Sequence, residues 1–531
     1  MRSSTGIVQL RLRLAATVVV AIGLAAACGG DDDTATSSPA IGDGAGPASS
    51  TPEPASHIEA AVEFAASTWD PHLVRNVSAD ANFLEPVYDT LVSIGEVDGK
   101  YALVPELAES WDVTADSTEL TFHLRPGATF HDGTPVDAEA VKVTFERAKT
   151  LEGSTVAERF AIVDSIDVVD DLSVTMRLSE PSPIYLWTLA DVYGMIISPA
   201  AFDSDLNVRP VGSGPYKLVS HSGDVVRYEK FDDYWNPDAG FVRTITTTSV
   251  VDENARLNGI LAGQYNLVTG RLSMLETARR EEAQGNLNVF MGPVINPHTI
   301  YFNTSRPGLD DPRVRLAMSL ALDRDGINET LFDGECPVEP QVLSENILGH
   351  IDAETPYDPE RARALLEEAG VSDLSFSMLT VAVGDVVPMA TVAQANWAAI
   401  GIDVEIVEYN AVEARAEYRN GNPSADLFIA SIPGGPDPYL ILANLLGPDA
   451  PGGLSDTLAA LQADADALAL DDPQRGPAYE EINRILVEQD PLQIGVCRPP
   501  RGWIAAPDVT NVSNLDQIYH WARTAKIGAA G

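Results

Sequence analysis

The sequence predicts an α/β protein with two or three packed units, and three observations lead to this prediction. The chain has 531 residues, too many for one hydrophobic core, and its 45% apolar content is ample for burial. Residues 389–400 have the spacing of a helix, with Trp397 assigned to the core, and Ile402, Val404 and Ile406 then alternate as a strand. The order of strand, helix and strand along the chain is typical of sheets buried beneath helices.

The folded part is expected to begin near His57, where a segment of strand and turn character starts. Farther on, residues 111–147 predict a hairpin, a turn and a helix. Apolar and polar side chains alternate from residue 120 to residue 124, the period of a half-buried strand. After a second turn, Asp137 is placed to cap the helix. The apolar positions of this helix recur at spacings of three and four: Ala138, Val141 and Phe145.

Residues 211–218, VGSGPYKL, predict a turn between two strands. Gly212 and Gly214 could lie against a phosphate. However, the lysine and the spacing of a P-loop are missing, and Pro215 disfavours a helix start with several free amides. The turn is therefore the favoured interpretation, and the alternation from residue 225 to residue 228 continues as a strand.

Three later segments predict amphipathic helices. The first starts at Leu257, ends at Gly263 and is followed by a short strand. Asp311 and Asp358 each precede a proline, the arrangement of an N-cap residue followed by proline at the first helical position. The helix after Asp358 ends at Gly370, a residue type expected there. The helix after Asp311 has an apolar face assigned to the core: Val314, Ala317, Met318, Ala321 and Leu322.

The charge of the chain disfavours one class of partner. Lys and Arg number 34 against 78 Asp and Glu, a formal net charge of −44. Affinity for nucleic acid depends on neutralising phosphates with cations, so nucleic acid and anionic membrane surfaces are poor partners. The acidity could serve cation binding, but a solvated surface suited to a salty environment also explains it.

The N-terminus predicts export. Three arginines precede an apolar run at residues 14–27 that is too short to span a bilayer as a stable helix. Residues 1–28 are therefore interpreted as a signal peptide. The small residues before Cys28 resemble a bacterial lipobox, in which that cysteine becomes lipidated. Because Ala25 stands where a lipobox usually has a large aliphatic residue, an ordinary secretory signal is the alternative.

Residues 29–56 contain almost no large apolar side chain, so we expect a disordered tether. Only Cys336 and Cys497 follow it, and an even pair in an oxidising compartment favours a disulfide that closes a long loop. Two free buried thiols are the alternative. No CxxC and no Cys/His cluster with zinc spacing occurs, so the sequence indicates neither a structural metal nor another cofactor.

Five segments resemble, in the same order, the large extracytoplasmic solute-binding proteins of ABC importers, family 5, the peptide- and nickel-binding type. The segments are residues 111–147, 301–327, 357–370, 396–406 and 425–442. The resemblance covers nearly everything after the tether. It implies a two-lobed periplasmic-binding-protein clamshell of type II, in the large cluster with an extra subdomain in the first lobe.

By analogy, residues 57–293 and 499–531 would form lobe I, with the extra subdomain at about residues 90–200, and residues 294–498 would form lobe II. Both cysteines would then lie in lobe II. The resemblance also implies a monomer that captures an oligopeptide or another small solute between its lobes. It would deliver the solute to a separate ABC permease with its ATPase subunits, at the outer face of the cytoplasmic membrane and held there by a lipid anchor only.

In peptide-binding relatives, an Asp three positions before an Asp-Pro pair holds the amino terminus of the peptide. Counting back from Asp437-Pro438, the matching position here is Gly434. A buried ammonium without a counter-charge is strongly disfavoured, so an ordinary free-amine peptide is disfavoured unless another acid takes over. Nickel-type relatives lack this Asp too, which keeps metal chelates, oligosaccharides, opines and blocked peptides open. Asp437 itself is expected to shape the turn.

The same analogy gives the other ligand-binding candidates. The loop of residues 78–83 would face the ligand from lobe I, and residues near 434 would face it from lobe II. Aromatic side chains near the hinge could stack on a ligand, although core packing is the alternative for every large apolar candidate. The complete candidate set is Asn82, Phe83, Tyr409, Ile432, Gly434, Pro436 and Trp503.

Enzymatic function has less support. The chain has no GxSxG, no HExxH and no cysteine nucleophile without a simpler role. With 78 acidic residues, paired carboxylates occur by chance, so an extracytoplasmic carboxylate-dependent hydrolase stays open as an alternative. A solute receptor that is not coupled to transport is a third possibility.

Overall fold

The computed structural model describes residues 56–512 except 76, 98, 240, 241, 296, 354, 382–385, 410–416, 418–424, 431–434, 447–451, 510 and 511. The predicted signal peptide, Cys28 and all but the last residue of the predicted tether lie outside the described residues. Within the described part of the chain, no helix combines the length and the apolar character needed to cross a bilayer.

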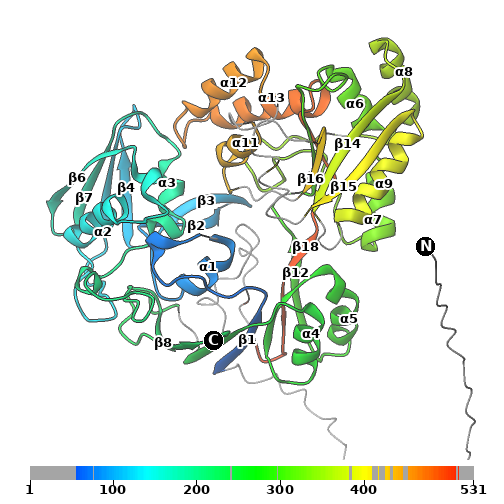
Figure 1. Ribbon diagram of the computed structural model, residues 1–531. Coiled ribbons are helices and arrows are strands. Elements are labelled where there is room, and N and C mark those ends of the chain that lie inside the picture. Colours follow the sequence, from blue (N-terminus) through cyan, green and yellow to red (C-terminus); the bar gives the residue numbers. More distant parts are fainter. Residues whose placement is uncertain are drawn as a thin grey trace, which may run out of the picture. The chain divides into compact units, whose positions relative to one another are not determined.

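A seven-stranded sheet is organised around β1 (His57–Val62), the first strand of the chain (Figure 1). Its order is β12-β18-β11-β1-β10-β9-β8, and β1 runs parallel to both β10 and β11. Helices α4 (Glu253–Leu261) and α5 (Leu272–Glu282) follow β10 and β11 and pack on the sheet through a shared apolar cluster. The other strands are β8 (Tyr216–Ser222), β9 (Val225–Lys230), β10 (Thr244–Ser249), β11 (Leu267–Gly270), β12 (Asn288–Pro293) and β18 (Pro500–Ala505).

The predicted hairpin, turn and helix are confirmed in a four-stranded antiparallel sheet of order β4-β5-β7-β6. The hairpin is β4 (Ala108–Val113) with β5 (Glu119–Leu124), and the helix is α2 (Ala138–Thr150). The carboxylate of Asp137 caps α2 by accepting a hydrogen bond from Ala140 N at 2.8 Å. The remaining elements of this region are β6 (Val163–Asp170), β7 (Ser173–Leu178), the pair β2 (Val92–Val97) and β3 (Lys100–Pro105), α1 (Val77–Leu84), α3 (Tyr185–Leu189), and the short 3₁₀ turns η1 (Pro71–Leu73), η2 (Ala157–Phe160), η3 (Val192–Gly194) and η4 (Pro199–Ala201).

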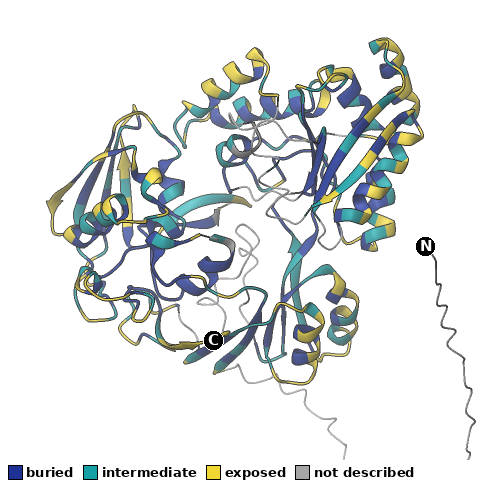
Figure 2. Cartoon of the chain, in the orientation of Figure 1, coloured by how far each residue is buried: buried dark blue, intermediate teal, exposed yellow. Residues whose placement is uncertain are grey.

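A five-stranded sheet of order β15-β14-β16-β13-β17 forms a second centre with its own core. Strand β14 runs parallel to both of its neighbours, β15 and β16, and helices cover the sheet with their exposed residues turned to the solvent (Figure 2). Trp397 is fully buried and donates its indole N–H to Met318 O at 2.8 Å, so its assignment to the core is confirmed. The strands are β13 (Thr299–Phe302), β14 (Leu374–Val381), β15 (Ile402–Tyr409), β16 (Leu427–Ala430) and β17 (Gln493–Gly495); the helices are α6 (Pro312–Leu320), α7 (Arg324–Phe332), α8 (Pro359–Ala369), α9 (Val386–Ala398), α11 (Pro438–Leu446), α12 (Asp456–Asp466) and α13 (Arg475–Glu488).

The Asp-Pro pairs at Asp311 and Asp358 begin helices as predicted. Asp311 caps α6 and Asp358 caps α8, each through its carboxylate and with proline at the first helical position. Gly370 ends α8 at φ +72°, a left-handed conformation that favours glycine. The apolar face predicted for α6 is buried in the core of this region.

Three local expectations differ from the structure. Residues 78–83 lie in helix α1 rather than in a loop. Helix α4 begins at Glu253, earlier than predicted, because Asp252 caps it. The segment before β8 is not a turn between two strands, since η4 precedes it, and Gly212 is required by packing: a Cβ atom there would lie 2.1 Å from Val87 O.

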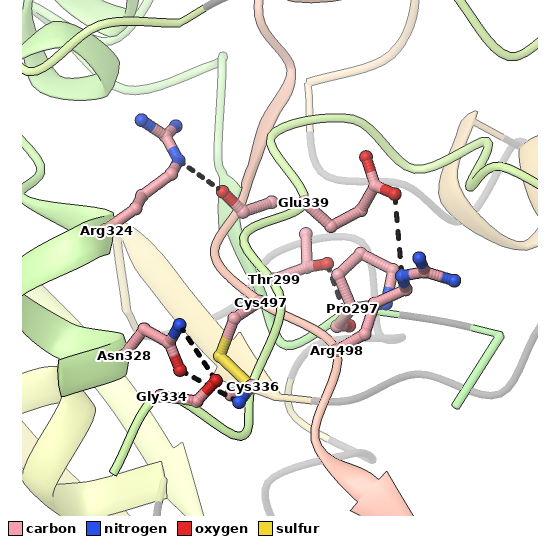
Figure 3. Close-up of a disulfide and its surroundings, with 10 residues drawn as sticks. Pro297, Thr299, Arg324, Asn328, Gly334, Cys336, Glu339, Cys497 and Arg498 are labelled. Atoms are coloured by element: carbon pink, nitrogen blue, oxygen red, sulfur yellow. Dashed lines mark hydrogen bonds and ion pairs between the residues drawn. A yellow bond between two sulfur atoms is a disulfide. The ribbon is translucent and has the colours of Figure 1, made fainter. Parts of the chain in front are cut away.

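Cys336 and Cys497 form a disulfide with a Cα–Cα distance of 5.4 Å (Figure 3). The bond joins the loop after α7 to the residue two positions beyond β17. Backbone hydrogen bonds join the same two segments: Arg498 N donates to Pro337 O at 2.9 Å, and Glu339 N donates to Val496 O at 3.1 Å. The pairing favoured from the sequence is therefore present, rather than two free thiols.

Two segments connect the seven-stranded sheet to the five-stranded sheet. Residues 294–298 run from β12 to β13, and residues 496–499 run from β17 to β18. They lie side by side, because β12 pairs with β18 and Val294 N donates to Pro499 O at 3.1 Å.

Candidate ligand-binding site

The carboxyl ends of three parallel strands meet at one edge of the five-stranded sheet. Strands β14, β15 and β16 end at Val381, Tyr409 and Ala430. The chain leaves β14 for β15 on one side and returns to β16 on the other, which makes β14 a topological switch point. In open α/β sheets, ligands bind outside the carboxyl ends of the strands at such a point. This topology makes the edge a candidate ligand-binding site.

One of the candidates from the sequence, Tyr409, lies at this edge. Tyr409 is the last residue of β15, is half-buried and packs against the larger apolar core. Ile432 and Gly434 follow the end of β16 by two and four residues and lie outside the described residues.

Pro436 and Asp437 immediately precede α11, and both are buried. One carboxylate oxygen of Asp437 accepts a hydrogen bond from Tyr439 N at 2.9 Å. Arg475 approaches from α13, and its Nη1 and Nη2 groups donate to the two oxygens at 2.8 Å each. Both oxygens are therefore occupied by the protein, and Asp437 shapes the start of α11 as expected.

The ion pair of Asp437 and Arg475 is almost completely withdrawn from water, with side-chain exposures of 3% each. Burial alone would lower the pKa of Arg475, but hydrogen bonding and attraction to Asp437 outweigh it and raise the pKa. The guanidinium also lies 5.1 Å from the ring centroid of Tyr479, whose hydroxyl donates to Asp466 at 2.5 Å. These contacts tie α11, α12 and α13 together next to the candidate edge.

The structure places the lobe I candidates in the interior. Phe83 is 1% exposed, and its ring centroid lies 6.2 Å from that of Trp69. Its carbonyl oxygen accepts a hydrogen bond from the Tyr228 hydroxyl at 3.1 Å. Asn82, the preceding residue of α1, is also buried. For Phe83, this is the core packing that was the alternative to ligand contact.

Trp503 lies in β18, in register with Thr269 of β11 and Phe290 of β12. It is 2% exposed and belongs to the larger core cluster. The indole therefore packs within the seven-stranded sheet, four residues beyond the segment that connects β17 to this sheet.

A charged cluster that the sequence analysis missed lies at the carboxyl ends of the parallel strands of the seven-stranded sheet. Glu63 follows β1 directly, and Arg271 follows β11 directly. Arg271 Nε donates to Glu63 Oε2 at 2.9 Å and Nη2 to Oε1 at 2.5 Å, a two-pronged ion pair. The only signal in the sequence is a charged residue directly after an apolar strand, and nothing in it reveals which two such residues meet.

Arg256 of α4 lies next to this pair and is 1% exposed. Its guanidinium donates to carbonyl oxygens at the ends of the strands: Thr269 at 3.1 Å, Val250 at 2.6 Å and Val251 at 2.9 Å. Burial lowers the pKa of Arg256, and the charge of Glu63 opposes this shift. Among the described residues, no group of three His, Cys, Asp or Glu side chains is arranged to hold a metal ion.

The family of the chain follows from a comparison with known proteins. The family model described as "Bacterial extracellular solute-binding proteins, family 5 Middle" matches residues 102–452. The chain belongs to this family, which confirms the resemblance seen in the sequence.

The chain is 33% identical over 282 residues to the glutathione-binding protein GsiB of Pectobacterium atrosepticum, covering 51% of this chain and 54% of that protein. It is 27% identical over 375 residues to the dipeptide-binding protein of Escherichia coli strain K12, covering 63% and 68%. The matches thus span from about half to two thirds of the length of these relatives.

Solved structures share the fold over nearly the whole chain. HbpA2 from Haemophilus parasuis aligns with a TM-score of 0.79 at 21% identity, covering 90% of this chain and all of that one. NikA from Brucella suis, solved in complex with Fe(III)-EDTA, aligns with a TM-score of 0.78 at 22% identity, covering 89% and 100%. The two-lobed α/β fold predicted for this chain is therefore confirmed.

Proposed function

We propose that this chain is the extracytoplasmic solute-binding subunit of an ABC importer, which captures a small solute between two lobes and delivers it to a membrane permease. The observation that carries this proposal is the family match over residues 102–452, together with a shared fold over 90% of the chain. The ATPase and the permease are separate subunits in this proposal, since the sequence has no nucleotide-binding motif.

We assign lobe I to residues 57–293 and 499–531, with its extra subdomain at about residues 90–200, and lobe II to residues 294–498. The adjacent segments 294–298 and 496–499 would then be the hinge, because they join the two large sheets. Closure around the solute requires that it bind the closed form more tightly than the open form. Export through residues 1–28 and a lipid anchor at Cys28 would hold the protein near its permease and raise its effective concentration there.

The chemistry of the solute is narrowed by the start of α11. Asp437 is neutralised by Arg475, and Gly434 stands where peptide-binding relatives have an acid. A free amino terminus therefore has no evident counter-charge in this loop. Relatives named for glutathione and for dipeptides support a peptide-like solute. Metal chelates, oligosaccharides, opines and blocked peptides are the further classes.

A thermal-shift screen of small solutes tests the proposed function. A true ligand should stabilise the folded chain by about 2.7 kcal/mol at 100 times its dissociation constant. Mass spectrometry should recover that solute unchanged. A solute that is converted to a product would favour the carboxylate-dependent hydrolase, and binding without permease-dependent uptake into cells would favour a receptor that is not coupled to transport.

Replacing Gly434 by aspartate should increase affinity for a peptide with a free amino terminus, because the new carboxylate supplies the counter-charge. Calorimetry with the dipeptide Met-Leu should show tighter binding to the variant, by about tenfold. The matched control is N-acetyl-Met-Leu, which has no ammonium group and should gain nothing. Equal behaviour of both peptides would mean that position 434 does not face the amino end of the solute.

A further inference from the structure

The Glu63–Arg271 pair has properties that a purely structural ion pair does not need. It joins the ends of β1 and β11, and its two side chains are 15% and 24% exposed. Glu63 engages Nε and Nη2 of the guanidinium. The Nη1 group of Arg271 has no hydrogen-bond partner among the described residues. Two N–H donors thus remain open at the strand ends.

The surroundings of Arg271 favour an anion. Arg256 adds a second, buried guanidinium that is bonded to backbone carbonyl oxygens rather than to a carboxylate. Among the acidic groups, Glu63 raises the pKa of Arg256 most. Glu253 and the exposed N-cap residue Asp252, both at the start of α4, raise it less. The inner part of the cluster therefore holds two guanidiniums and one carboxylate, in a chain whose net charge is −44.

The backbone adds to this preference. Arg271 is the N-cap residue of α5, and its side chain makes no capping hydrogen bond. The first turn of an α-helix has amide groups without intrahelical acceptors, and its dipole favours negative charge. The preference of this helix start for negative charge thus adds to that of the open Nη1 group.

We propose that Arg271 binds a carboxylate of the transported solute and that Glu63 is the residue that positions the guanidinium for this contact. The inference rests on the proposed function, and it names an acidic solute as the substrate class. Its placement is independent of the family, since ligands bind at the carboxyl ends of parallel strands in open α/β sheets. It also agrees with the loop before α11, where Arg475 neutralises Asp437 and no acid stands at position 434 to attract an ammonium group.

The experiment measures binding of acids, and of counterparts whose carboxylates are esterified or amidated, to the full exported chain by calorimetry. Three pairs serve as probes: glutathione and its diethyl ester, N-acetyl-Met-Leu and its amide, and citrate and its trimethyl ester. At least one acid should bind, and its ester or amide should bind at least tenfold more weakly. Arg271→Gln should weaken binding of that acid by about ten- to hundredfold and abolish the preference for acid over ester, because charge-assisted hydrogen bonds are lost.

The matched control is Arg279→Gln, which removes an arginine from the exposed face of the same helix, where Arg279 pairs with Glu282 at 2.8 Å. This variant should bind the acid like the unmodified chain. Because Arg271→Gln leaves Glu63 unpaired, the double variant Glu63→Gln/Arg271→Gln is measured too, and it should show the same loss of acid binding with no unpaired carboxylate. Arg271→Lys should keep part of the affinity, since it retains the charge but not the two-pronged geometry.

The outcomes separate this inference from the proposed function. Acid binding that survives Arg271→Gln, or equal binding of acid and ester, would overturn the carboxylate contact and leave the proposed function standing. If neither these probes nor a metabolite extract stabilises the unmodified chain, the proposed function fails and the carboxylate contact fails with it.

Discussion

Replacing Arg475 by methionine is expected to lower the free energy of unfolding by about 3–5 kcal/mol, because it leaves a buried carboxylate without its counter-charge. Asp437 is 3% exposed in its side chain and receives both Nη groups of Arg475 at 2.8 Å. Arg475 is the first residue of α13, where the helix dipole disfavours a cation, so the attraction of Asp437 is what holds the guanidinium there. Urea unfolding followed by circular dichroism measures the change.

The same helix supplies the control. Arg484 of α13 pairs with Glu481 at 2.6 Å, but these side chains are 41% and 51% exposed. Arg484→Met should therefore change the free energy of unfolding by less than about 1 kcal/mol. A double variant, Asp437→Asn/Arg475→Met, should recover part of the loss, since the unpaired charge is gone. Equal effects of Arg475→Met and Arg484→Met would refute the view that Arg475 stabilises the start of α11.

Local signals explain why many elements could be predicted from the sequence. Asp311 and Asp358 carry both the capping carboxylate and the following proline, so the starts of α6 and α8 depend on adjacent residues only. The alternation in β5 and the spacing in α2 are likewise local, and burial of the predicted apolar positions follows from them. Such elements are predictable because the residues that determine them lie within a few positions of one another in the sequence.

Helix α1 was missed because its residues favour other structures locally. The segment VSADANFL contains serine, aspartate and asparagine, whose side chains compete for backbone hydrogen bonds and favour turns. Its position is set instead by distant contacts. Asp80 accepts hydrogen bonds from the backbone and the hydroxyl of Ser67, at 2.6 and 2.8 Å, and Phe83 packs beside Trp69. Tertiary contacts of this kind leave no periodic signal.

In the candidate site, too, local features could be predicted from the sequence and distant contacts could not. The loop before α11 could be located from the Asp437-Pro438 pair and the family pattern, both of which are local strings. The partner of Asp437 could not, because Arg475 lies 38 residues farther along the chain. Glu63 and Arg271 are separated by 208 residues and meet only because β1 and β11 are neighbours in the sheet. Pairs that create charge patterns at a site therefore emerge from topology rather than from spacing.

Removing the disulfide is the second change expected to have a large effect. Cys336 and Cys497 are separated by 161 residues and are both fully buried. Closing so long a loop restricts the unfolded chain, so the variant Cys336→Ala/Cys497→Ala should lose about 3–5 kcal/mol of unfolding free energy. The same denaturant titration, carried out without reductant, compares it with the unmodified chain.

Reduction provides an independent route to the same result and distinguishes loop closure from lost packing. The unmodified chain should become about as unstable as the double variant when reductant is added, whereas the double variant should not respond, because no bond remains to be broken. The effect should reach the segment 496–499, since Arg498 N and Val496 O form hydrogen bonds with Pro337 and Glu339 in the loop that carries Cys336. Hydrogen exchange of these amides should then accelerate on reduction, while amides of the four-stranded sheet around β5 should not change. Two reactive thiols in the denatured, unreduced protein would instead support the free cysteines considered from the sequence.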